Sequence, residues 1–398
     1  MAKRTRVHSR DLQPQLATPR GLLSLARVQR FDWPMQLPVT EINELGRRLH
    51  VGTTTDIPTV TVTVEGFDVT HNTIAYMSGA TPGTFPVSGV SISALKNVDV
   101  IGQIRDASTL GIVNALYVKR GVVSGIDTTF GVKANTTISY TISSNSKKEL
   151  KQPVFYDSLT PALVSGGATV ALTHTPTYLT RTSGYILDAY RTGTDGTTGY
   201  LDEGTDFTVT AGNISFIGSN VATSDTIWVT YVSPSTTTLF ANLDSVSPAA
   251  VMGKYVPTTI SLSTIPRVQA VTIKVALAPE SIDEMGSLGK QVGYEVGVPS
   301  VTGDLTVLKT DNDLLAILEG VSNTTIENNM EFAQTNLPLK IQLRNPANPS
   351  QILLTYYIPS ITISQESDTD QVNQSMNEVF SWQSTTGEMF IISGAGPY

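Results

Sequence analysis

The chain has 398 residues, only 15% of them charged, and a formal net charge of −8. Its length predicts two or three domains, each large enough to bury its own core. The low charge content, together with abundant Thr, Ser, Val and Gly, favours β structure and extensive packing. The acidic balance argues against a protein that grips nucleic acid through its phosphates, because such binding needs clustered Lys and Arg.

The chain contains no cysteine, which excludes disulfides, thiolate metal sites and cysteine nucleophiles. No apolar run approaches the roughly 18 residues that span a bilayer, and the basic start of the chain lacks the apolar stretch of a signal peptide. We therefore expect a cytosolic product with no membrane partner. Residues 1–25 are predicted to form an N-terminal arm, either a solvated tail or a contact element that orders on assembly.

An internal repeat organises the chain. Residues 26–46 match residues 266–286 without a gap at an offset of 240, and the match resumes at an offset of 241 after one inserted residue. The matching residues share their order, their spacing and the positions of glycine and proline. This favours an internal duplication over two segments that are merely similar in composition. The identical pairs include Arg27/Arg267, Val28/Val268, Gln29/Gln269, Leu37/Leu277, Pro58/Pro299, Gly79/Gly320 and, in a weaker stretch, Ser124/Ser364.

The repeat predicts a first copy over residues 26–148 and a second over residues 251–398. In each copy a proline turn leads into a strand and then into a helix whose apolar stripe ends near Gly79 or Gly320. The strands are expected at 60–64, 99–104, 112–123 and 136–142, and at 301–308, 339–343, 352–364 and 378–383. Each copy should therefore be a six- or seven-stranded antiparallel barrel or sandwich with one flanking α-helix, in a fold that is mainly β.

The segment 149–250 between the copies carries its own set of predicted strands. They fall at 168–173, 185–189, 207–210, 213–217 and 226–232, with a tight hairpin at Ala211-Gly212. Short strands at regular spacing predict an immunoglobulin-like β-sandwich. Its proline-flanked edges, 151–153 and 233–235, read as domain boundaries.

No constellation of residues indicates chemistry. The four histidines, His8, His50, His71 and His174, lie in unrelated surroundings and form no nucleophile-and-base motif. Zinc-ligand spacing is absent, and the Gly-rich stretch 193–196 lacks the Lys-Ser/Thr of a phosphate loop. We expect no catalytic, cofactor-binding or metal site, and hence no enzyme.

One acidic run could in principle ligate Ca²⁺. Glu366, Asp368 and Asp370 supply carboxylates, but the run lacks the glycine and the bidentate acid of a known calcium loop. A solvated hairpin tip is the simpler interpretation.

The two copies resemble the tail tube proteins of long-tailed (siphovirus-like) bacteriophages. The resemblance rests on a barrel with one flanking helix and on the element Ile-Asn-Glu-Leu-Gly, or Ile-Asp-Glu-Met-Gly, ahead of a Val-Gly…Pro-x-Val-Thr strand, and it covers about two thirds of the chain. It implies rings that stack into a hollow tube, with inner strands of adjacent subunits forming a continuous lumen. Members of this family commonly carry an outward-facing Ig-like domain.

This chain departs from that pattern by carrying two tube folds, so the expectation is a homotrimeric ring with pseudo-sixfold symmetry. The resemblance implies a virion protein, assembled in the host cytoplasm, that conducts DNA during ejection. Its expected partners are further copies of itself, the tape measure protein and tail terminator or baseplate proteins, with transient DNA passage. The alternatives are a trimeric baseplate hub or distal tail protein, and a carbohydrate-binding tail fibre protein.

The lumen of such a ring is predicted to be acidic or neutral, because each inward Lys or Arg would add a phosphate contact that slows DNA. The candidate lumen or inter-ring carboxylates are Asp127, Glu366, Asp368 and Asp370. The alternative is that these residues only keep the surface soluble.

Overall fold

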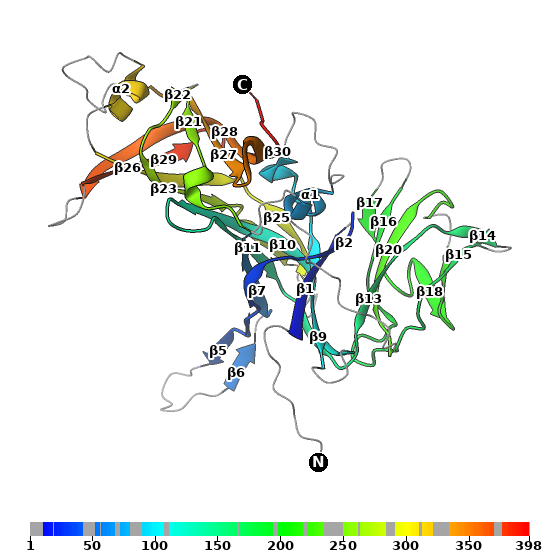
Figure 1. Cartoon of the computed structure of the whole chain (residues 1–398). Helices are drawn as coiled ribbons and strands as arrows, with labels where there is room; N and C mark the ends of the chain where they lie inside the picture. Colours follow the sequence, from blue (N-terminus) through cyan, green and yellow to red (C-terminus); the bar gives the residue numbers. More distant parts are fainter. Residues whose placement is uncertain are drawn as a thin grey trace, which may run out of the picture.

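A computed structural model describes residues 11–397 apart from 19, 43–51, 56, 68–71, 80–89, 107–110, 165–166, 194–197, 218–220, 235–249, 262, 284–290, 310–312, 321–333 and 370–375. The structure is mainly β, with strands accounting for 63% and several antiparallel sheets. The described residues include two short α-helices, α1 (Asn72–Ser78) and α2 (Asp313–Glu319). Figure 1 shows an elongated body with a separate group of strands, β13 to β20, docked to one side.

The first half of the body pairs its strands in the order β1-β9-β10-β11-β7-β3. Short strands β2, β4 and β12 are added to β1, β7 and β10. The bounds are β1 Leu12–Thr18, β2 Gly21–Ser24, β3 Val28–Asp32, β4 Met35–Gln36, β7 Thr59–Gly66, β9 Val98–Arg105, β10 Ile112–Gly131, β11 Thr137–Ser144 and β12 Lys147–Leu150.

The second half repeats this order as β21-β27-β28-β29-β26-β23. Strand β22 is added to β21, and β30 joins β28 to β8 of the first half. The bounds are β8 Val90–Ser91, β21 Thr258–Ile260, β22 Ser263–Thr264, β23 Val268–Ala276, β26 Ser300–Leu308, β27 Leu337–Asn345, β28 Asn348–Thr369, β29 Asn377–Ser384 and β30 Phe390–Ser393. Single 3₁₀ turns lie at Ile92–Ala94 and Gly253–Tyr255.

The registers of the two halves agree residue by residue. Val64 lies opposite Tyr140, and at offsets of 241 and 240 Leu305 lies opposite Phe380. The β-bulges recur too: β10 has one between Val123 and Gly125, and β28 has one at the same place, 240 residues on. Both short helices end at a glycine with positive φ, as expected for a left-handed helix terminus.

The structure explains why the Arg-Val-Gln triplet recurs. Arg27 and Arg267 both adopt positive φ, 60° and 58°, a conformation that needs local support outside glycine. The side-chain amides of Gln29 and Gln269 donate to the arginine carbonyls at 3.2 and 3.1 Å. The triplet thus encodes a turn into the first strand of each half.

The two halves join through the C-terminal part of β10. Residues Gly125–Gly131 pair with β23, so the strand order runs continuously as β3-β7-β11-β10-β23-β26-β29-β28. Buried residues from both halves form one core, in which Phe130 packs edge-on against Tyr356 with ring centroids 5.4 Å apart. The halves therefore do not bury separate cores.

Among the described strands, no sheet closes into a barrel, so the barrel prediction is wrong. Closure of the first half would require β3 to pair with the β1 and β9 side. Instead β3 lies over that layer, and a Cβ atom at Gly102 of β9 would lie 3.3 Å from the ring of Phe31. The two layers are stacked face to face, and the long strands β10 and β28 pass from one layer to the other.

The predicted N-terminal arm is too long. Residues 12–18 form β1, which pairs with β9 along its length and is almost wholly buried. The alternation-free sequence Leu-Gln-Pro-Gln-Leu-Ala-Thr gave no strand signal, because this strand is covered on both faces.

The inserted segment forms two four-stranded antiparallel sheets, β13-β20-β16-β17 and β14-β15-β19-β18. They enclose a core of their own. The predicted hairpin is confirmed: Ala211 and Gly212 have φ of 50° and 84° and connect β18 to β19. The bounds are β13 Val154–Leu159, β14 Ala162–Val164, β15 Gly167–Ala171, β16 Ile186–Thr192, β17 Thr198–Tyr200, β18 Phe207–Thr210, β19 Asn213–Phe216 and β20 Thr226–Val232.

Two further hairpins occupy equivalent places in the halves, β5 (Val39–Ile42) with β6 (Gly52–Thr55), and β24 (Pro279–Asp283) with β25 (Gln291–Val296). Hairpin β5–β6 projects away from the body (Figure 1), whereas β24 reaches the junction and contacts β10.

Candidate functional site

The continuous sheet exposes one hydroxyl-rich face. Along β7, β11 and β26, buried residues alternate with outward-facing ones, as in a strand with one face on a core. This face, called the polar face below, is made mainly by short uncharged side chains. They include Thr59, Thr61, Thr63, Thr129, Thr137, Ser139, Thr141, Ser143, Thr272, Ser300, Thr302, Thr306, Ser381 and Gln383.

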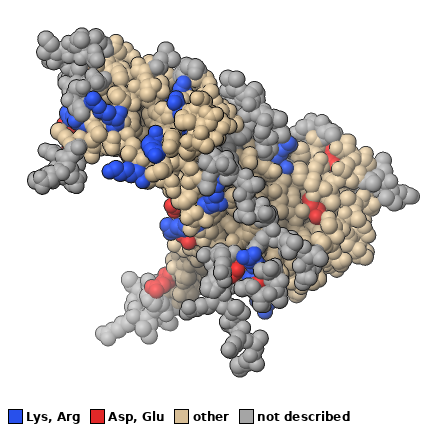
Figure 2. Space-filling view, in the orientation of Figure 1, with Lys and Arg blue, Asp and Glu red and all other residues tan. Residues whose placement is uncertain are grey.

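Few charges interrupt the polar face. Asp127 of β10 lies directly opposite Lys274 of β23, on the strand pair that joins the halves. Asp304 is held by two hydroxyl donors, Thr272 at 3.2 Å and Ser381 at 2.7 Å. Among the described strands that form the polar face, the charged residues at outward positions are Arg30, Asp32, Glu65, Asp127, Lys274 and Asp304. Acidic groups thus outnumber basic ones at these positions. On the side of the molecule drawn in Figure 2, most of the described surface is neither acidic nor basic, and its Lys and Arg patches are more extensive than its Asp and Glu patches.

The structure separates three of the four carboxylates that the sequence suggested as one class of site. Asp127 lies on the polar face and is exposed. Glu366 and Asp368 lie on the opposite side of the sheet, because Asp368 is paired with the buried Glu378 and Glu366 with the buried Phe380. Asp370 lies outside the described residues.

Two sequence-based assumptions about this acidic run differ from the structure. Strand β28 does not end near Ser364 but runs to Thr369, so Glu366 and Asp368 are not at a hairpin tip. The bulge between Ile363 and Gln365 then reverses which side chains face outward. The residue equivalent to Asp127 at the offset of 240 is Ser367, not an acid.

Glu366, Asp368 and Glu378 place carboxylate oxygens within 4.8 Å of one another. The ammonium of Lys309, just beyond β26, lies among them, 2.7 Å from Asp368 and 3.3 Å from Glu378. Burial raises the pKa of Glu378, and a hydrogen bond with Glu366 raises it further. The single lysine offsets only one of the three carboxylates, so this cluster is an ion-pair network with an excess of negative charge, which the raised pKa of Glu378 reduces.

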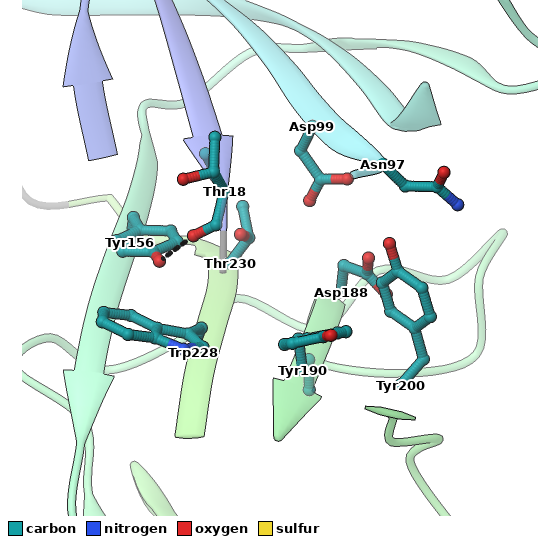
Figure 3. Close-up of a pocket in the computed structure, with 11 residues that line it drawn as sticks. Thr18, Asn97, Asp99, Tyr156, Asp188, Tyr190, Tyr200, Trp228 and Thr230 are labelled. Carbon is teal, nitrogen blue, oxygen red and sulfur yellow. Dashed lines mark hydrogen bonds between the residues drawn. The ribbon is translucent and has the colours of Figure 1, made fainter. Parts of the chain in front are cut away.

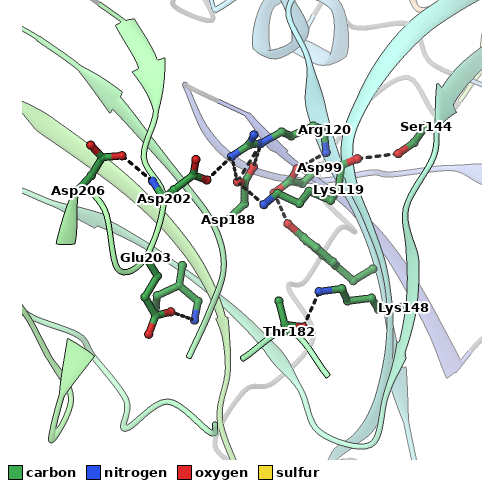
Figure 4. Close-up of polar contacts among 12 residues, drawn as sticks. Asp99, Lys119, Arg120, Ser144, Lys148, Thr182, Asp188, Asp202, Glu203 and Asp206 are labelled. Atoms are coloured by element: carbon green, nitrogen blue, oxygen red, sulfur yellow. Dashed lines mark hydrogen bonds and ion pairs between the residues drawn. The ribbon is translucent and has the colours of Figure 1, made fainter. Parts of the chain in front are cut away.

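A second polar cluster joins the body to the inserted sheets (Figure 4). Arg120 of β10 donates to Asp188 of β16 from Nε to Oδ2 at 3.2 Å and from Nη2 to Oδ1 at 2.8 Å, a bidentate geometry that a guanidinium is shaped to make. Lys119 lies 3.2 Å from the same carboxylate. The guanidinium also lies 3.8 Å from the ring centroid of Tyr200, which fixes it from the other side.

Asp99 of β9 accepts a hydrogen bond from the backbone of the same arginine. Its carboxylate accepts from the hydroxyl of Tyr117 and from the backbone N–H of Arg120, both at 2.7 Å. Burial raises the pKa of Asp99 to about 7, and the nearby charge of Asp188 adds to the rise. The two hydrogen bonds favour the ionised form and oppose this shift.

Aromatic and acidic side chains line a small cavity at this junction (Figure 3). Two carboxylates beside Tyr190, Tyr200 and Trp228 resemble the side-chain set of a sugar site. The cavity, however, holds only about 30 Å³, room for one or two water molecules and not for a sugar ring. Asp188 is also occupied by its bidentate partner. The carboxylate pair is therefore a structural element of the docked interface.

Apolar packing completes the attachment of the inserted sheets. Ile101 and Tyr117 of the body are fully buried against Val154, Leu187 and Val232 of the insertion. Their neighbours Val100 and Val118 point the other way, into the shared core. The insertion therefore covers the outer side of the layer that contains β9, on the opposite side of the body from the polar face.

His174, the histidine within the described part of the chain, packs its ring against Phe155 at 4.3 Å between centroids. Residues 194–196 of the Gly-rich stretch, like the other three histidines, lie outside the described residues. Sequence reasoning missed the Arg120–Asp188 cluster, because its members come from strands that only the tertiary fold brings together.

No family model matches the chain, and no curated protein is significantly similar to it. Across the described residues, the helices are too short to cross a membrane.

Proposed function

We propose that the chain is a structural protein of a phage tail tube, whose copies associate edge to edge into a ring. The observation that carries this proposal is the internal junction between β10 and β23. Among the described strands, the same two kinds of edge recur without a strand partner at the ends of the strand order, β28 in the second half and β3 with β4 in the first. A head-to-tail contact between copies would satisfy both edges.

The polar face supports the lumen of such a ring. Its hydroxyl groups are neutral and hydrated, and its few charges include more acids than bases. DNA phosphates bind where counterions are released by Lys and Arg, so a face poor in both gives little retention. The inserted sheets, docked on the opposite side of the body, would lie outside the ring.

Two equivalent halves per chain support a threefold ring with pseudo-sixfold symmetry. Three copies would contribute about 24 strands, and at about 4.8 Å per strand the backbone circle would measure roughly 115 Å around and about 37 Å across. That diameter leaves room for a DNA duplex after side chains are added. Stacked rings of this kind would form a conduit for DNA ejection in the virion tail, assembled in the host cytoplasm.

Electron microscopy of the purified, overexpressed protein tests the proposal. Hollow tubes with threefold rings and outward protrusions are expected. Isolated rings that never stack would favour the baseplate hub or distal tail alternative. A protein that stays monomeric at high concentration, in the presence and absence of tail-assembly partners, would refute the tube.

A further inference from the structure

Leu37 and Leu277 are identical residues at equivalent positions with opposite environments. Leu277 follows β23 and is 2% exposed, because it is buried in the core at the junction with the first half. Leu37 follows β4 and is 53% exposed. The preceding positions differ in the same way: Val275 is 3% exposed and Met35 is 46% exposed. An apolar edge is therefore covered in the second half and left open in the first.

The covered edge shows how the open one can be satisfied. The backbone N–H of Leu277 donates to the carbonyl of Ser124 at 3.0 Å. Ser124 occupies the bulge of β10, and its hydroxyl donates to the carbonyl of Thr141 at 3.2 Å. Ser364 occupies the equivalent bulge of β28, and its hydroxyl donates to the carbonyl of Ser381 at the same distance. A bulge serine whose carbonyl can accept from the backbone N–H of such a leucine is thus present twice in the chain, as Ser124 and as Ser364.

We infer that residues 33–37 of one copy pair with residues 364–368 of the next copy, in the register of the internal junction. Leu37 would then donate to the carbonyl of Ser364 and become buried, and Gln36 would lie opposite Gln365, as Ala276 lies opposite Gly125. The inference rests on the proposed function in requiring contact between copies. It adds the strands, the register and the anchoring residue.

Pro34 does not obstruct this pairing. Its carbonyl accepts from the N–H of Thr61 at 3.2 Å, so its backbone groups face β7. In an antiparallel strand the N–H and carbonyl of one residue point to the same side. The N–H that proline lacks would therefore have pointed toward β7, not toward the neighbouring copy. The outward-facing backbone groups belong to Trp33, whose carbonyl accepts from the ammonium of Lys147 at 3.2 Å, and to Met35 and Leu37. Leu37 is the equivalent of the donor Leu277, and pairing of residue 33 would replace the Lys147 contact.

The partner must be a second copy and not the same chain. Strands β3 and β28 stand at opposite ends of the strand order, with six strands between them. At about 4.8 Å per strand the two edges are roughly 30 Å apart, and the sheet would have to close on itself to bring them together. One unpaired copy of each edge per chain defines a head-to-tail contact.

Disulfide trapping tests the register directly, because the chain has no native cysteine. The double variant Gln36→Cys with Gln365→Cys, expressed as the full chain, would place thiols on directly opposed residues, a spacing that a disulfide can bridge. Mild oxidation of the assembled protein should give covalent dimers and trimers on non-reducing gels. The control is Gln36→Cys with Glu366→Cys, a one-residue shift that puts the second thiol on the other face of the sheet. Equal or stronger cross-linking of the control overturns the register.

Substitution tests the anchor. Leu37→Arg should weaken association at least about tenfold by analytical ultracentrifugation, since burial of a leucine would be lost, while the circular dichroism spectrum stays unchanged. Ile217→Arg, at an exposed apolar residue of the insertion, should assemble normally. Suppose that wild-type protein forms rings, that the Leu37→Arg variant forms rings equally well, and that the Gln36→Cys/Gln365→Cys variant does not cross-link. The proposed contact between copies is then wrong, but the tube proposal stands. If wild-type protein forms no rings, both fail.

Discussion

Arg120 and Asp188 lie 68 residues apart in the chain and form a bidentate ion pair between the body and the inserted sheets. Asp188 is 6% exposed at its side chain, and Arg120 is about one third exposed. Arg120→Ala should lower the free energy of unfolding by about 2–3 kcal/mol, because it leaves a buried carboxylate with only Lys119 as a partner. Urea denaturation measures this change.

Two comparisons make that prediction specific. Arg30→Ala removes a partner of Asp32 in a largely exposed pair and should cost less than about 1 kcal/mol. The double variant Arg120→Ala with Asp188→Ala should recover part of the loss, since no buried charge is then left unpaired. Additive losses in the double variant would contradict a direct coupling.

Asp99 should make stability depend on pH. Its pKa is raised to about 7 in the folded protein by burial, with the charge of Asp188 adding to the rise, against about 3.9 in an unfolded chain. The folded state therefore binds more protons between these values, and the free energy of unfolding should fall as pH rises from about 4 to about 7. The contribution amounts to about 2–4 kcal/mol.

Asp99→Asn isolates this effect. It keeps the shape of the side chain and an acceptor for Tyr117 or the Arg120 N–H, but does not titrate. Its unfolding free energy should change less across the same pH range, measured by urea titration at each pH. Glu378, whose pKa is also raised by burial, remains in both proteins. Identical profiles for the two proteins would show that Asp99 does not titrate there.

Gly303 is required by close packing between strands. A Cβ atom at this position would lie 2.0 Å from the carbonyl of Thr272 and 2.4 Å from the ring of Trp382. Gly303→Ala should therefore destabilise the protein by about 3 kcal/mol or more, measured by thermal or urea denaturation. Gly199→Ala is the matched control, because nothing lies within 4 Å of its Cβ position, and it should be neutral or slightly stabilising. A tolerated Gly303→Ala would contradict the register of β23 with β26.

The wild-type polar face should not retain DNA, and adding positive charge to it should cause retention. Thr129→Lys with Thr141→Lys places two cations per chain at outward positions of β10 and β11. Assembled variant tubes should retain duplex DNA at low salt and release it as salt rises, because retention depends on phosphate contacts. Filter binding measures the retention.

Thr208→Lys is the control for charge alone, since it alters an exposed threonine of the inserted sheets. Tubes with this change should bind DNA no better than wild-type tubes. Equal retention by both lysine variants would show that the polar face does not line the channel.

Alternation along the strands was predictable where one side of a strand faces a core. The runs at 60–64 and 136–142 fall on β7 and β11, whose polar sides form part of the polar face. Strand β1 was not predictable in this way, because it is buried on both sides. The acidic run of β28 was misplaced because a one-residue bulge, which leaves no distinctive sequence signal, reverses the side on which each carboxylate lies.

The sequence by itself determined the mainly β character, the repeated order of punctuating residues and the separate strand set of the insertion, because these depend on local periodicity and turn chemistry. Only the tertiary structure decided that the sheets stay open, that the halves share one core across β10 and β23, and that Arg120 meets Asp188. Those outcomes depend on contacts between residues far apart in the chain. Leu37 and Leu277 illustrate the division: they are the same residue in the same repeat, and only the neighbouring strand determines which one is buried.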